Sequence, residues 1–394
     1  MKKYCCRLTL FIFLYTYCAK VVATLPTSVT IPNDLIFADF FPYCCDNGES
    51  ARFVGQWSLY NQGQAIPLFE KNVSGSGSFL INNDYLEYAR YRADMKAPEA
   101  WAIRTDASSV IIAVIDSGVN YLHPDLTSNL WVNEAELHGK PEIDDDGNGV
   151  IDDIYGASVE NGGQLITGDP MDTGGHGTSI AGIIGAVGNN SYGITSICWK
   201  ARIMAVRCEH FSPEEIAVAI RYAIQNGARI INMSLGTWYE SAEERSAFEE
   251  AERAGVIIVL SAENGGNDTD DPSYRRFPAS WKFPNCIVVT ATTPEDKLWR
   301  GASFGASGVD IAAPGRLIVT LGFSPEMPYQ YETGTSFAAP HVAGAAALVW
   351  SEWPNLSNEE VLSHLKKTAD RVPKINGLTA SGRLNLYRAL SEYP

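Results

Sequence analysis

The sequence is poor in basic residues, and after its first two dozen residues it has no long apolar run. Lysine and arginine number 30 against 46 aspartates and glutamates, which gives a formal net charge of −16 at pH 7. An acidic surface disfavours nucleic acid and anionic lipid as partners. No later segment reaches the roughly 20 apolar residues that a membrane helix needs. We therefore expect a monomer that binds neither nucleic acid nor, once mature, a membrane.

Cysteine is also scarce, with eight in 394 residues, and the spacing fits no zinc motif. Residues 1–23 combine a basic start, a short apolar stretch and small residues, which indicates a secretory signal cleaved after Ala23. A retained signal anchor is the alternative. Cleavage leaves five cysteines, and an odd number leaves at least one thiol unpaired or intermolecular. Cys208 and Cys286 lie in apolar runs, so we expect them in the core of an exported protein, extracellular or periplasmic.

Short apolar runs alternate with helical patterns along the rest of the chain. The runs are Val110–Ile115, Ile203–Val206, Ile230–Met233, Val256–Leu260 and Ile287–Thr290. Capping boxes predict helices that start after Ser212 and after Ser357, and a third helix is expected over Ala242–Ala254. This alternation predicts an α/β fold in three layers, with a mostly parallel sheet and helices on both faces.

Three segments contain residues suited to nucleophilic catalysis. Asp116 stands where a buried run ends, His176 lies between glycines before an apolar helix, and Ser336 lies at the start of another helix. Each residue alone fits an ordinary role: a turn aspartate, a structural histidine and an N-cap serine. Together they supply a nucleophile, its base and a carboxylate that orients the base. Their order along the chain is one of the known orders of such triads.

These three segments resemble the signature blocks of the subtilisin-like serine protease family, and the resemblance runs from about residue 95 to residue 390. It implies that Asp116 orients His176, that His176 acts as general base and then acid, and that Ser336 attacks the scissile carbonyl. The implied function is a secreted serine endopeptidase acting on proteins or peptides through an acyl-enzyme. The alternative is a catalytically silent protein of this fold that captures peptides without cutting them.

The resemblance also implies positions that contact the substrate. Asn264 matches the family's oxyanion donor, with the Ser336 N–H as its companion. Ser234, Leu235 and Gly236 match the strand that pairs with an extended peptide, although the preceding run is also a core strand. Glu263 stands where the family commonly has glycine. Its carboxylate either lines the pocket for the side chain that precedes the cut or points to solvent.

An acidic loop has the spacing of a calcium site. Oxygen ligands at alternate positions surround a glycine, which is the rhythm of a calcium-binding loop. The expected ligands are Asp144, Asp146, Asn148, Asp152 and the carbonyl of Val150. The twelfth position is Tyr155, so this is not a complete EF-hand. A solvated acidic turn is the alternative.

A second calcium site follows from the family resemblance alone. Asp125 would supply a carboxylate, and the loop over 188–194 would supply Asn190 and backbone carbonyls. The expected carbonyl donors are Gly188, Tyr192 and Ile194. Calcium at either site should be structural, because it would tie loops together and stabilise the folded state by linkage.

The chain is thereby divided into three parts. Residues 1–23 form the signal, and residues 24–94 form an N-terminal extension without a recognisable full-size pro-domain. Residues 95–394 form the catalytic domain.

Overall fold

The structure is a computed structural model that describes residues 30–34, 42–44, 50–52, 56–59, 61, 65–67, 86–88 and 93–394. The predicted signal over 1–23 and much of the predicted extension lie outside the described residues. Among the residues that are described, no helix combines the length and the apolarity needed to cross a bilayer.

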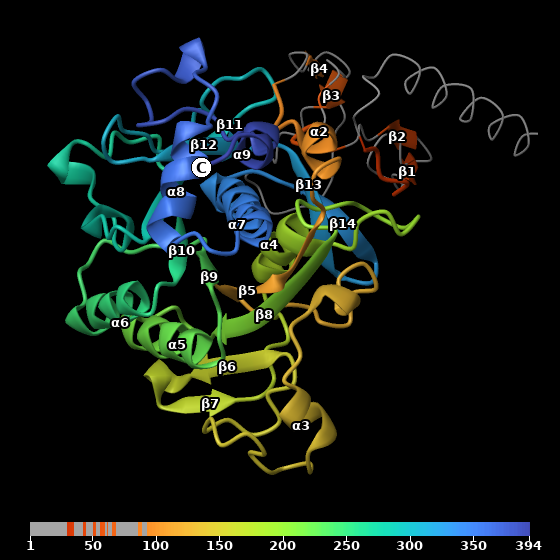
Figure 1. Cartoon of the computed structure of the whole chain (residues 1–394), viewed down its shortest axis with the longest axis vertical. Helices are drawn as coiled ribbons and strands as arrows, with labels where there is room; N and C mark the ends of the chain where they lie inside the picture. Colours follow the sequence, from red (N-terminus) through yellow and green to blue (C-terminus); the bar gives the residue numbers. More distant parts are fainter. Residues whose placement is uncertain are drawn as a thin grey trace, which may run out of the picture.

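An eight-stranded sheet forms the centre of the described part of the chain (Figure 1). Its order is β12-β11-β10-β9-β5-β8-β6-β7, and only β6 and β7 pair antiparallel. The strands are β5 (Asp106–Asp116), β6 (Gly156–Glu160), β7 (Leu165–Thr167), β8 (Lys200–Cys208), β9 (Ile230–Met233), β10 (Ile257–Ser261), β11 (Cys286–Thr292) and β12 (Ile311–Pro314). The predicted α/β class with a mostly parallel sheet is confirmed.

The remaining strands that the structure describes form three two-stranded antiparallel sheets. They are β1 (Pro42–Cys44) with β2 (Ser50–Arg52), β3 (Ala65–Pro67) with β4 (Leu86–Tyr88), and β13 (Ile318–Ser324) with β14 (Met327–Glu332). The α-helices are α2 (Ala97–Trp101), α3 (Glu134–His138), α4 (His176–Gly185), α5 (Pro213–Gln225), α6 (Ala242–Arg253), α7 (Thr335–Glu352), α8 (Asn358–Lys367) and α9 (Leu386–Ser391). Short 3-10 helices span Thr127–Asn129, Asn161–Gly163, Pro272–Tyr274, Ala279–Trp281 and Pro373–Ile375.

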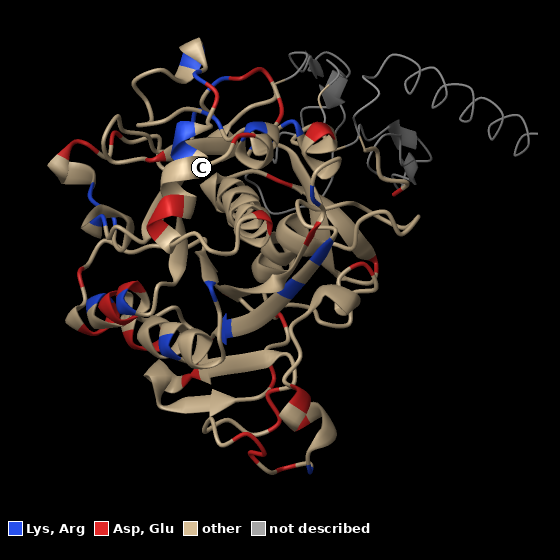
Figure 2. Cartoon of the chain, in the orientation of Figure 1, with Lys and Arg blue, Asp and Glu red and all other residues tan. Residues whose placement is uncertain are grey.

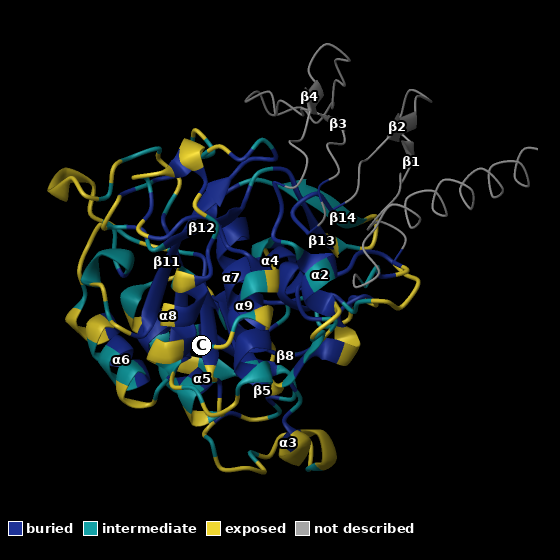
Figure 3. Cartoon of the chain, turned by 45° about the horizontal axis from the view of Figure 1, so that its top comes forward, coloured by how far each residue is buried: buried dark blue, intermediate teal, exposed yellow. Residues whose placement is uncertain are grey.

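Helices cover both faces of the central sheet. On β5, Ile112 and Val114 belong to one apolar cluster with α4 and α7, whereas Ala113 and Ile115 belong to a second cluster with α5 and α6. Alternate side chains of a strand point to opposite faces, so a continuous apolar run is what a doubly covered strand requires. Figure 3 shows α7 buried along its length and the surface helix α3 exposed.

Local signals in the sequence place the helices correctly. Ser212 caps α5 with both hydrogen bonds of a capping box, and Ser357 does the same for α8. The third predicted helix is α6, and the five predicted runs correspond to β5, β8, β9, β10 and β11. Cys208 and Cys286 are buried as expected. The short strands β6, β7 and β12 and the β13–β14 hairpin were not predicted.

Described parts of the predicted extension pack against the catalytic domain. Trp57 and Leu59 are buried in the cluster that contains α4 and α7. Gln56 exchanges two hydrogen bonds with the backbone of Thr195, at 2.6 and 2.9 Å. Asp34 accepts hydrogen bonds from the backbone of the loop over 188–194. These contacts join described residues of the extension to the catalytic domain, and the division at residue 95 stays a prediction.

Candidate active site

The three candidate catalytic residues lie at the starts and ends of elements that converge at one edge of the sheet. Asp116 is the last residue of β5, His176 is the first residue of α4, and Ser336 is the second residue of α7. Because β5 is central and parallel to its neighbours, its carboxyl end faces the edge where open α/β sheets build their sites.

A carboxylate–imidazole pair forms half of the expected triad. His176 Nδ1 lies 2.8 Å from Asp116 Oδ1 and 3.0 Å from Asp116 Oδ2. Asp116 is buried, while the imidazole is about one-third exposed. Burial alone would lower the pKa of His176, but the charge and hydrogen bond of Asp116, with smaller contributions from Glu332 and Asp172, raise it above its ordinary value.

Close backbone packing determines where His176 lies. Gly175 has φ +86°, and a Cβ there would collide with the Phe323 ring, so only glycine fits without displacement. A Cβ on Gly177 would meet the carbonyl of Gly118. The glycines on either side of His176 therefore let α4 begin directly against the end of β5.

Asp172, which sequence reasoning missed, organises the turn that enters α4. Its Oδ1 accepts hydrogen bonds from Ser117 Oγ at 2.9 Å and from the N–H groups of Gly174 and Gly175 at 2.8 and 2.7 Å. Its Oδ2 accepts from the N–H and the hydroxyl of Thr178. A buried carboxylate with five donors fixes this turn, and its position four residues before the histidine was the only available sequence signal.

Ser336 is held beside the segment that follows β9. Its hydroxyl donates a long hydrogen bond, 3.4 Å, to the carbonyl of Ser234. The Ser234 hydroxyl in turn donates to the Ser336 carbonyl at 2.9 Å. The ring of Phe337 lies edge-on to His176 with the centroids 5.3 Å apart, which brings the imidazole to the first turn of α7. A weak hydroxyl contact is readily exchanged for another acceptor when a substrate binds.

The Asn264 side chain is oriented with its amide nitrogen available. Its Oδ1 accepts hydrogen bonds from the N–H and the hydroxyl of Thr335, at 2.9 and 3.0 Å. Nδ2 is therefore left as a donor. It lies beside Gly334, just before α7, 3.3 Å from the position that a Cβ on this glycine would occupy. Asn264 is exposed, so a developing oxyanion next to Ser336 has access to this donor. Thr335 was not singled out from the sequence.

The segment expected to bind the peptide lies beside the nucleophile candidate. Ser234, Leu235 and Gly236 follow β9 directly, and Gly236 is exposed. The Glu263 carboxylate lies against Gly236, because a Cβ added to this glycine would overlap Glu263 Oε1. Of the two predicted orientations of Glu263, the structure therefore has the one that faces the peptide-binding segment.

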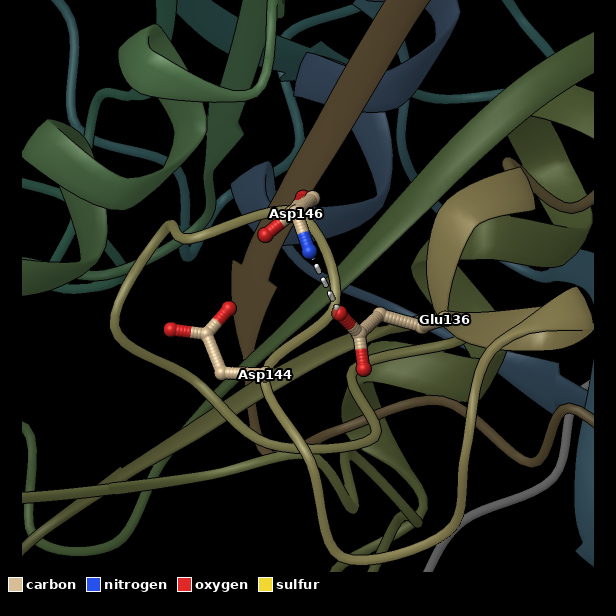
Figure 4. A group of neighbouring side chains, drawn as sticks. All are labelled: Glu136, Asp144 and Asp146. Atoms are coloured by element: carbon tan, nitrogen blue, oxygen red, sulfur yellow. Dashed lines mark hydrogen bonds between the residues drawn. The ribbon is translucent and has the colours of Figure 1, made fainter.

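The acidic loop brings part of its predicted ligand set together. The carboxylates of Asp144, Asp146 and Glu136 lie within 4.8 Å of one another (Figure 4). Glu136 comes from α3 and was not predicted, and its Oε1 also accepts the N–H of Asp146 at 3.1 Å. Figure 2 shows the acidic residues gathered on α3 and the loop after it. Three converging carboxylates are a donor set that suits a hard cation such as calcium.

The other predicted ligands of this loop make different contacts. Asn148 Oδ1 accepts the N–H of Val150 at 2.8 Å, and its amide donates to Asp146. The Asp152 carboxylate accepts the N–H of Glu142 at 2.9 Å, and Asp152 does not belong to the three-carboxylate cluster. The spacing thus identified the loop, but only two of its expected side chains join the cluster.

The second expected calcium site is built around a buried carboxylate. Asp125 accepts hydrogen bonds from Asn190 Nδ2 and the Ile194 N–H, both at 3.0 Å. Burial, followed by the charge of Asp34, raises the pKa of Asp125 to about 7. Asp34 was not predicted here, and burial raises its pKa as well; two buried carboxylates close together favour a nearby cation. The contacts around Asp125 are all N–H or O–H donors, so a cation would require the Asn190 amide to present its oxygen.

The remaining predicted donors of this second site belong to the same loop. Gly188 donates its N–H to the Trp199 carbonyl at 3.3 Å, and Tyr192 donates its N–H to Asn190 Oδ1 at 2.8 Å. These contacts use the N–H groups of Gly188 and Tyr192, and the carbonyl ligands expected from Gly188, Tyr192 and Ile194 stay predictions.

Comparisons with known proteins agree with the arrangement of these elements. The model of the subtilase family matches residues 107–387. Subtilisin-like protease 1 of Plasmodium falciparum is 33% identical over 304 residues, which cover 72% of this chain and 43% of the relative. Thermitase of Thermoactinomyces vulgaris is 32% identical over 317 residues, covering 79% of this chain and 99% of the relative.

A solved protease structure has a similar fold. A protease from Pseudoalteromonas arctica superposes with a TM-score of 0.60 at 26% identity, covering 76% of this chain and 94% of that one. The chain spans less than half the length of the Plasmodium relative. The family match covers more than half of this chain and includes all three candidate catalytic residues. The chain belongs to the subtilase family.

Proposed function

We propose that this chain is a serine endopeptidase in which Asp116, His176 and Ser336 form the catalytic triad. The observation that carries the proposal is the hydrogen bond from His176 Nδ1 to the buried Asp116 carboxylate beside the first turn of α7. A carboxylate on Nδ1 leaves Nε2 as the basic nitrogen, which is the tautomer that accepts a proton from a serine hydroxyl.

The reaction follows from the roles of these groups. His176 takes the proton of the Ser336 hydroxyl as its oxygen attacks the scissile carbonyl, and it then gives that proton to the leaving amine. The Ser336 N–H at the start of α7 and Asn264 Nδ2 stabilise the oxyanion. Water then attacks the acyl-enzyme by the same proton transfers in reverse, which releases the acid and regenerates the serine.

The substrate is proposed to be an extended segment of protein or peptide. The segment Ser234–Gly236 follows a core strand, lies next to Ser336 and becomes exposed at Gly236, so an added peptide strand would bring its carbonyl to the nucleophile.

Calcium is proposed as a structural ion. The cluster of Glu136, Asp144 and Asp146 supports one site, and Asp125 with the loop over 188–194 supports another. The three carboxylates of the first site would otherwise repel one another, and at the second site the Asn190 amide would turn its oxygen toward the ion; bound calcium would hold each loop closed. Export is proposed from the sequence of residues 1–23 alone.

The test is turnover of unfolded casein by the purified protein. The expected result is cleavage that Ser336→Ala abolishes while binding of the casein persists. A folded wild-type protein that binds casein without cutting it would instead support the silent peptide-binding alternative.

A further inference from the structure

Three backbone segments lie side by side near Ser336, whose hydroxyl contacts the Ser234 carbonyl. The first is 234–238, which follows β9, and the second is 262–264, which follows β10; β9 and β10 are paired in parallel. The third is 276–277, which pairs with the first through hydrogen bonds between Thr237 and Phe277 at 2.7 and 2.9 Å. A peptide strand added along Ser234–Gly236 would bring its scissile carbonyl to Ser336 and Asn264, so the side chain before the cut would lie close to Glu263, the residue that precedes Asn264.

Glu263 extends its carboxylate from the second of these segments to the first. It has φ +74°, a conformation in which glycine is far easier to accommodate than glutamate. Its Oε1 lies against Gly236, at a point that a Cβ on this glycine would occupy. The side chain thus reaches from the oxyanion segment to the peptide-binding segment.

Arg276 provides the opposite charge at the same place. It precedes Phe277, which pairs with Thr237, and its guanidinium stacks over the exposed ring of Trp238 in the first segment. Burial raises the pKa of Glu263, and the charge of Arg276 acts in the opposite direction. Since no ion pair within 4 Å joins the two residues in the described structure, both remain able to interact with a third group.

We propose that Glu263, between Asn264 and Gly236, sets the charge preference of the enzyme, so that lysine or arginine immediately before the cut is favoured over glutamate or aspartate. This inference rests on the proposed peptidase function. Glu263, which lies nearest the peptide-binding segment, attracts a basic side chain. The positive charge of Arg276, which acts on Glu263, opposes that attraction, so the two variants that remove these charges should shift the preference in opposite directions.

The experiment measures kcat/KM on peptides that differ only in the residue before the cut, Lys or Glu. Glu263→Gln is expected to lower the Lys:Glu ratio about tenfold or more, and Arg276→Gln is expected to raise it. Glu240→Gln removes an exposed carboxylate nearby and serves as the matched control, with the ratio unchanged.

The outcomes separate this inference from the proposed function. A wild-type enzyme that turns over both peptides, with a ratio unchanged in Glu263→Gln, overturns the inference and leaves the peptidase function in place. A folded wild type that cleaves no peptide and takes no organophosphorus label at Ser336 overturns the function itself. If Glu263→Gln does not fold, the direction of the Arg276→Gln shift decides, and an unchanged or lowered ratio there counts against the proposal.

Discussion

Replacing Asp172 with asparagine tests whether the turn before α4 positions the catalytic histidine. Asp172 receives five hydrogen bonds, three on Oδ1 and two on Oδ2. Asparagine keeps one acceptor oxygen and puts an NH2 group in place of the other. If the oxygen keeps the three donors of Oδ1, the NH2 group faces the N–H and hydroxyl of Thr178. Hydrogen bonds to a charged group contribute about 1.5–3 kcal/mol each, so Asp172→Asn should cost about 2–4 kcal/mol of unfolding free energy.

The same variant should impair catalysis more than binding. A displaced His176 slows proton transfer, so kcat should fall about tenfold or more while KM changes little. Unfolding in urea and steady-state kinetics on one peptide give the two quantities. Asp169→Asn is the matched control, because Asp169 lies in the same loop, is exposed and contacts Tyr121 and the Met171 N–H. An Asp172→Asn enzyme with unchanged stability and unchanged kcat would refute the reasoning.

Three further predictions follow from other groups. Glu244 is fully buried, and its carboxylate oxygens have no hydrogen-bond partner among the described residues. Burial raises the pKa of Glu244 to about 7, so the folded state favours the protonated form. The folded protein therefore loses stability as the pH rises from about 4.5 to about 7. Urea unfolding at pH 5 and pH 8 measures this loss. Between the two pH values the unfolding free energy of the wild type should fall by about 1–3 kcal/mol more than that of Glu244→Gln, and an equal fall in both proteins would refute the prediction. Calcium should raise the melting temperature, and Glu136→Gln should reduce that gain while the exposed Glu134→Gln does not; equal gains would count against the cluster as a calcium site. In the wild type, kcat/KM should rise as His176 loses its proton, at a pH above the ordinary histidine pKa of 6.5. Glu332→Gln removes a charge that raises this pKa, so it should move the rise to lower pH. A rise below pH 6.5 in the wild type would contradict the geometry.

The sequence predicts the centre of this fold well because its signals there are local. The apolar run over Val110–Ile115 needs only strand geometry to be interpreted, and the capping box at Ser212 needs only the first turn of α5. The β13–β14 hairpin was missed because most of β14 is only partly buried and lacks the alternation that marks a half-buried strand.

The candidate site shows the same division. The segments of Asp116, His176 and Ser336 are recognisable from short motifs, whereas Asp172 and Glu136 act through contacts that only the folded chain brings together. Asp172 holds backbone N–H groups of a neighbouring turn. Glu136 reaches the acidic loop from a separate helix, and no spacing rule within the loop could have included it.

Labelling by an active-site-directed organophosphorus reagent, followed by mass spectrometry of the peptides, tests the central claim most directly. The account predicts one adduct per chain, on the peptide that contains Ser336, lost in Ser336→Ala and strongly slowed in His176→Ala. A folded wild-type protein that takes no label, or that is labelled at another serine with equal speed in both variants, would contradict it.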